Sequence, residues 1–311
     1  MQKRLQNRVA ESRMTLPVVA AYAVAVWVAA GLLTYQSWLS FVAMAVTTYL
    51  MVELNNQNAL IRIYSRMVSC SFLVLSCAAM FLFPSWKAAV GCLCFVTFLL
   101  LLSRTYQDKQ SPGGTFYAFC FLGFASLIHA HILYFLPLFW LFMAFKVLSL
   151  SWRTFFASLL GVLLPYWLAL PYFIWQADFS LLAGHFMSLL QVEPFDYATL
   201  SVQQVVYFLF LVALCLTGTV HYLRSRYKDK IRTRLLYDCF VIMTWLCAVL
   251  LVLQPKHATL LLPMMVVSLS TLIGHFLALT STRWTNIGFY VIMVLSLLIT
   301  AFNLWIPSLH F

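Results

Sequence analysis

The sequence predicts an all-α protein that crosses a membrane about eleven times, and three observations support this prediction. Hydrophobic residues make up 64% of the 311 positions and charged residues only 9%, whereas about a quarter of the residues in a soluble domain are charged. The hydrophobic residues form runs of roughly 13 to 22, which is near the length of about 20 that crosses a bilayer. Finally, Lys and Arg gather in alternate polar segments.

Eleven hydrophobic stretches are predicted to span, and each must be helical because a helix satisfies its own backbone hydrogen bonds in lipid. The first is too long for a signal peptide and lacks a small-x-small cleavage pattern, so we expect it to be retained. The fifth and sixth are short, and they form either two short spans or one re-entrant hairpin. The stretches are 15–33, 38–52, 67–83, 88–103, 116–128, 132–145, 154–174, 205–223, 235–253, 258–279 and 287–304.

The distribution of basic residues predicts the orientation, because Lys and Arg accumulate in cytoplasmic segments. With the N-terminus in the cytoplasm and the C-terminus outside, 17 of the 19 basic residues lie on the cytoplasmic side. Only Lys87 and Lys256 then lie outside. The net charge of +11 therefore reflects membrane topology, and no nucleic-acid partner is expected.

The segment 175–204 is predicted to be a long outer loop of a single membrane domain, 1–311. Its apolar residues recur at helical spacing, which indicates an amphipathic helix on the membrane surface. The loop also holds three acids, Asp178, Glu193 and Asp196, and no Lys or Arg. Glu193 and Asp196 are candidates for a catalytic base; the alternative is a solvated acidic loop.

Asp178 is a candidate for substrate binding at the predicted outer side, and so are four other polar residues. His129 and His131 would converge only in a turn, and the alternative is a polar interfacial turn. Lys256 and His257 lie in a short outer hairpin, where an ammonium group can hold a phosphate; an incidental Lys in a turn is the alternative.

The eight cysteines show no spacing typical of a metal site, so neither a metal nor a cofactor is predicted. On the cytoplasmic side, a polar cluster follows the second span. It binds a lipid head group or a partner, or else it closes the helix with an Asn cap. Its members are Glu53, Asn55, Asn56 and Arg62.

Residues 50–175 include the segments NNQNALIRIYSR, GGTFYAFCFLGFASLIHAHILYFLPLFWLFMAF and SWRTFFASLLGVLLPYWLALPYFIW. This part of the chain resembles a family of multi-spanning inner-membrane proteins of Bacteroidota. Leu122–Leu127, Leu136-Pro137 and Lys256–Pro263 are also similar to segments of GT-C glycosyltransferases, which take sugars from polyprenyl-phosphate carriers. Those enzymes place a catalytic acid in a long first outer loop, whereas the loop here, Thr34–Ser37, is short and has no acid.

The GT-C resemblance implies a protein that binds, or acts on, a lipid-linked glycan at the outer face. Lys256, with His257 nearby, would bind the phosphate of the carrier, and Glu193 or Asp196 would be the base. Membrane lipids, including polyprenyl phosphate, are the expected partners. One alternative is a non-catalytic subunit that packs against a partner membrane protein. A second is a transporter, which the scarcity of ionisable residues within the spans disfavours.

Overall fold

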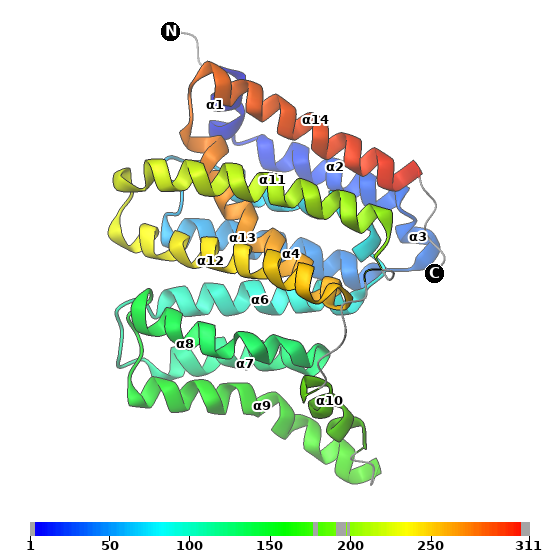
Figure 1. The fold of residues 1–311 in the computed structure, drawn as a ribbon, viewed down its shortest axis with the longest axis vertical. Coiled ribbons are helices and arrows are strands. Elements are labelled where there is room, and N and C mark those ends of the chain that lie inside the picture. The colour runs from blue at the N-terminus through cyan, green and yellow to red at the C-terminus, as the bar shows by residue number, and fades with distance from the viewer. Residues whose placement is uncertain (1–3, 177–179, 191–196, 198–199, 306–311) are drawn as a thin grey trace. The chain divides into compact units, whose positions relative to one another are not determined.

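The computed structural model describes residues 4–176, 180–190, 197 and 200–305 (Figure 1). The predicted residues Asp178, Glu193 and Asp196 lie outside these ranges. The described residues are all α-helical or in short 3-10 helices, turns and loops, so the all-α prediction is confirmed for this part of the chain.

Each of the eleven predicted stretches coincides with helix. The α-helices are α1 (Leu5–Glu11), α2 (Thr15–Ala29), α3 (Leu32–Tyr35), α4 (Trp38–Asn58), α5 (Met67–Ala78), α6 (Trp86–Arg104), α7 (Pro112–Ile128), α8 (Leu136–Phe145), α9 (Trp152–Gln176), α10 (Ser180–Leu190), α11 (Val202–Ser225), α12 (Ile231–Leu253), α13 (Ala258–Leu279) and α14 (Arg283–Trp305). The 3-10 helices are η1 (Met80–Leu82), η2 (Ala130–Phe135), η3 (Arg226–Lys228) and η4 (Pro255–His257).

Length and composition support seven or eight of the eleven predicted crossings. Among the described residues, seven helices are long and apolar enough to cross a membrane, or eight if the bent pair α1 and α2 is one span. The helices α5, α7 and α8 are apolar but shorter. The protein is therefore a multi-pass helical membrane protein, and crossing by the shorter helices remains a prediction.

The chain divides into two compact units. Unit 1 comprises 1–89 and 197–311, and unit 2 comprises 90–196. In unit 1, α13 is the central helix, because α5, α11 and α12 pack around it and most of its side chains are buried. In unit 2, the closest pair of helices is α7 and α9.

Within each unit, a glycine lets the backbones of two helices approach closely. A Cβ added at Gly274 of α13 would lie 2.9 Å from the Cα of Val68 in α5. In unit 2, a Cβ at Gly161 of α9 would lie 2.5 Å from the carbonyl oxygen of Phe116 in α7. Membrane helices gain little from the hydrophobic effect on association, so close van der Waals packing of this kind contributes to their stability together with interhelical hydrogen bonds.

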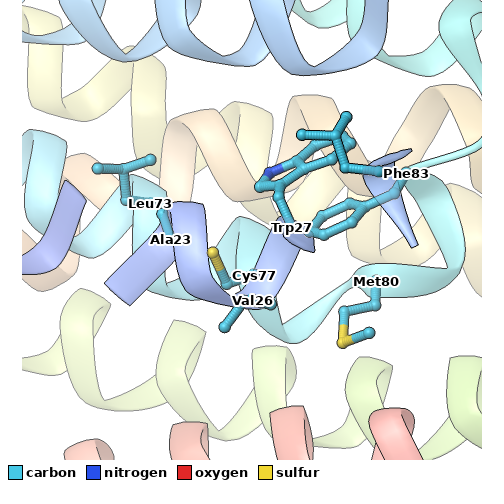
Figure 2. Packing of buried hydrophobic residues seen from close by; sticks show 8 residues of the cluster. Ala23, Val26, Trp27, Leu73, Cys77, Met80 and Phe83 are labelled. Carbon is cyan, nitrogen blue, oxygen red and sulfur yellow. The ribbon is translucent and has the colours of Figure 1, made fainter. Parts of the chain in front are cut away.

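Apolar side chains fill the space between the helices of unit 1. Trp27 of α2 stacks on Phe83 with ring centroids 3.7 Å apart, and both side chains are buried. Figure 2 shows this stack together with Val26, Cys77 and Met80. The cluster joins α2 to α5 and to η1, which fixes the position of the first long helix.

We expect Gly161→Ala to lower the free energy of unfolding by about 1–3 kcal/mol, since its Cβ meets backbone atoms that cannot rotate away. The matched control is Gly113→Ala, because a Cβ at Gly113 of α7 meets no atom within 4 Å. Alanine there is expected to be neutral or slightly stabilising. Equilibrium unfolding in detergent measures both, and equal effects would show that the α7–α9 contact is not close.

Candidate functional site

The basic residues of unit 1 gather at one end of its helices. Arg62 in the α4–α5 loop donates to the carbonyl oxygen of Lys228 over 3.4 Å. Arg4, just before α1, donates to the carbonyl oxygen of Ser281, between α13 and α14. Each bond joins two segments that lie at this end of the helices, and we call this region the basic end. Its basic residues are Arg4, Arg8, Arg13, Arg62, Arg66, Arg224, Arg226, Lys228, Lys230, Arg232, Arg234 and Arg283.

A buried pair of ionisable side chains lies within the basic end. His275 Nε2 of α13 is 3.0 Å from Asp229 Oδ2, which precedes α12. The two side chains are 0% and 3% exposed. A buried carboxylate is tolerated only with a partner of this kind, because desolvation of an unpaired charge is very unfavourable.

Aromatic rings surround the pair. The ring centroid of Tyr237 lies 4.8 Å from that of His275, and the centroid of His221 lies 5.3 Å from it. Nearby, Tyr222 Oη donates to Asp238 Oδ1 over 2.8 Å. This arrangement ties α11, α12 and α13 together at their basic ends. His275 and Asp229 are shielded from solvent, so a substrate would not reach them. We therefore interpret the pair as an anchor for the α11–α12 turn rather than as an acid–base site.

The predicted cytoplasmic cluster lies in the same region, but its members have separate partners. Asn55 Nδ2 donates to the carbonyl oxygen of Ser65 over 3.1 Å, and Asn55 Oδ1 accepts from the backbone of Ile61 over 3.3 Å. Asn55 thus closes the α4–α5 loop. The residue after α4 that adopts the left-handed conformation is Ala59, with φ 45°, rather than an Asn.

The remaining members of the cluster make local contacts. Glu53 accepts from the side chain of Gln57, one turn further along α4. Asn56 is exposed and accepts from Arg66 over 3.3 Å. A residue outside the prediction, Asn58, accepts from Arg232 of α12 over 2.8 Å. The cluster therefore links loops at the basic end.

The opposite end of unit 1 is where α2, α5, α12 and α14 finish. Asn303 Nδ2 of α14 donates to the carbonyl oxygen of Ala78 at the end of α5, over 2.7 Å. A cavity of about 20 Å³ lies beside them, lined by Trp27, Gln203 and Asn303 among others. That volume fits about one water molecule, so the cavity is too small for a sugar.

Lys256 and His257 lie at this opposite end, in η4 between α12 and α13. The side chain of Lys256 is exposed and that of His257 is half-buried. The last turns of α12 lead to them with exposed apolar side chains, Val249, Val252 and Leu253. A cationic group therefore stands at the tip of an apolar helix face.

The histidines of unit 2 lie at the junction of α7 and η2. His129 follows the last residue of α7, and the ring of His131 in η2 packs against Tyr134, with centroids 5.6 Å apart. The Oη of Tyr134 donates to the carbonyl oxygen of Leu189 in α10. The turn that holds both histidines is thus in contact with α10, which lies within the predicted outer loop.

Sequence reasoning missed two polar groupings. One is His275 with Asp229, whose only sequence signals are a His inside an apolar stretch and an acid inside a basic run. The other lies in unit 2, where Tyr166 Oη is 2.9 Å from Ser126 Oγ and 3.4 Å from His185 Nε2 of α10. No spacing rule joins residues so far apart in the sequence.

Among the described residues, no group of three or more His, Cys, Asp or Glu side chains could hold a metal ion. The eight cysteines are free and buried, where they act as small apolar residues. Comparisons with models of protein families, with curated proteins and with solved structures give no match.

We expect Asp229→Ala to destabilise the protein by about 3–5 kcal/mol, because it removes the partner of a buried ionisable group. The control is Asp108→Ala, since Asp108 is exposed and its carboxylate accepts from the backbone N–H of Gln110, two residues away. That change should alter stability by less than about 0.5 kcal/mol. Chemical denaturation in detergent measures both, and a small effect at Asp229 would contradict the anchoring role.

Proposed function

We propose that this protein lies in a bacterial inner membrane and binds the phosphate of a polyprenyl-phosphate-linked glycan at its outer face. Lys256 and His257 would form the phosphate site. The basic end would lie in the cytoplasm and the opposite end outside. Binding is the proposed activity, and catalysis on the glycan is a further step of the same hypothesis.

The gathering of basic residues supports this orientation. Twelve described basic residues of unit 1 lie at the basic end, and Lys87 and Lys256 lie elsewhere. Cytoplasmic segments carry this excess of Lys and Arg. With α1 at the basic end and eleven crossings, the N-terminus would be in the cytoplasm and the C-terminus outside.

The observation that carries the proposal is the position of Lys256. Topology does not explain a basic residue at the opposite end, because charge bias disfavours Lys there. Its side chain is exposed, and the adjacent face of α12 offers Val249, Val252 and Leu253 to lipid. A polyprenyl chain could lie along this face with its phosphate at the ammonium group.

The positions of the acidic residues are the reason that we propose binding ahead of catalysis. The described acids of unit 1 are Glu11, Glu53, Asp229 and Asp238, all near the basic end. The predicted carboxylate bases, Glu193 and Asp196, lie outside the described residues, as does Asp178. The proposed contact between Lys256 and the phosphate does not depend on these acids.

We expect Lys256→Ala to weaken the binding of undecaprenyl phosphate by about 1–3 kcal/mol, the range for a hydrogen bond to a charged group. Lys87→Ala is the matched control, because Lys87 is also an exposed Lys of unit 1 away from the basic end, beside the interfacial Trp86. Titration of purified protein with the lipid measures both. Equal and negligible losses would remove the proposal in favour of a non-catalytic membrane subunit.

The orientation is tested by labelling single cysteines from each side, in a chain whose eight native cysteines are replaced. Leu190→Cys at the end of α10 should react only from outside, whereas Tyr227→Cys in η3 should react only from the cytoplasm. Both positions are exposed, so accessibility within the protein does not bias the result. Labelling of position 190 only from the cytoplasmic side would overturn the orientation.

A further inference from the structure

An apolar groove opens on the side of unit 1 near the basic end. Its volume is about 140 Å³, and its walls come from α1, α2, α5, α13 and α14. Six of its apolar lining residues are Val19, Val74, Ile273, Leu277, Phe289 and Met293. An engineered apolar cavity of about 150 Å³ stays dry and takes up benzene, so this groove favours a hydrocarbon group over water.

The groove lies between α2 and α14. Tyr22 Oη of α2 donates to Thr300 Oγ1 of α14 over 3.1 Å, which joins the two helices toward the opposite end. Nearer the basic end, the groove is lined by Val19 of α2 and Met293 of α14, with α5 and α13 also contributing. Met293 is exposed, so the groove communicates with the surrounding lipid.

The short helix α1 crosses the end of the groove. It makes an angle of 91° with α2, so it would lie along the membrane surface if α2 spans the bilayer. Val9 of α1 and Thr15 of α2 both line the groove, and Thr15 Oγ1 donates to the carbonyl oxygen of Val9 over 2.5 Å. Buried Gln6 anchors α1 by donating to the carbonyl oxygen of Leu277, over 2.8 Å.

Two exposed Arg residues lie next to groove-lining residues in the sequence. Arg8 is adjacent to Val9, and Arg13 lies two positions before Thr15; both are exposed. Glu11 lies between them in the sequence and is also exposed, so these three side chains give a net positive charge. Exposed Arg side chains at a membrane surface attract anionic lipid head groups.

We propose that the groove binds one acyl chain of an anionic phospholipid from the leaflet at the basic end, with its phosphate at Arg8 and Arg13. An apolar groove with two exposed cations within two residues of its lining matches a lipid with an apolar tail and an anionic head. The site differs from that of Lys256, because the two lie at opposite ends of unit 1.

The test counts lipids retained by the purified full-length protein, using native mass spectrometry with phosphatidylglycerol and with phosphatidylcholine. The wild type should retain one phosphatidylglycerol in preference to phosphatidylcholine. The double change Arg8→Ala and Arg13→Ala should weaken this binding about tenfold or more, from the loss of two surface charges. Val74→Trp should also abolish it, because the indole fills the groove without changing any charge.

Two control variants separate the site from general effects. Arg224→Ala with Lys230→Ala removes two exposed charges from the basic end away from the groove, and Val291→Trp adds the same indole to an exposed position of α14 that does not line the groove. Both should retain the lipid. Equal losses in both charge variants, or unchanged binding in Val74→Trp with thermal unfolding like the wild type, would overturn the proposal.

A further measurement separates this site from the proposed function. The Arg8→Ala and Arg13→Ala variant should bind undecaprenyl phosphate as the wild type does, whereas Lys256→Ala should still retain phosphatidylglycerol. Glycerol phosphate should not displace the phospholipid, because it lacks the acyl chain. Displacement by glycerol phosphate would indicate a free-phosphate site instead and would contradict the proposal.

Discussion

The cost of placing charge in hydrocarbon governs the arrangement of this protein. Only 9% of its residues are charged, and the described ones of unit 1 lie at the ends of its helices rather than at their middles. A charged side chain at the bilayer centre is unfavourable by several kcal/mol, so these residues mark the limits of the apolar layer. Both proposed lipid sites follow from this constraint, because each pairs an apolar surface with a cation at its end.

Two groups of interior polar side chains obey the same constraint by pairing. His275 and Asp229 are both almost fully buried and lie 3.0 Å apart. Tyr207 Oη of α11 likewise donates to the carbonyl oxygen of Leu75, 2.9 Å away. In the absence of water, each such bond favours one arrangement of neighbouring helices over others, and so polar contacts specify the packing that apolar contacts alone would leave loose.

Glycine decides how closely the helices approach. Gly274 in unit 1 and Gly161 in unit 2 each leave no room for a Cβ, because backbone atoms of the neighbouring helix occupy that space. Such contacts bring long stretches of two helices within van der Waals distance. Between α2 and α14, near the basic end, an apolar groove remains instead.

The sequence by itself determined the helical class, the position of every long helix and the alternation of basic segments, since each depends on local composition and on the thickness of a bilayer. It also singled out Lys256, whose position departs from the charge bias. The tertiary structure decided three other features. These are the pairing of His275 with Asp229, the separate partners of Asn55 and Asn56, and the apolar groove near α1. Each depends on residues far apart in the sequence, and neither periodicity nor spacing encodes which helices become neighbours.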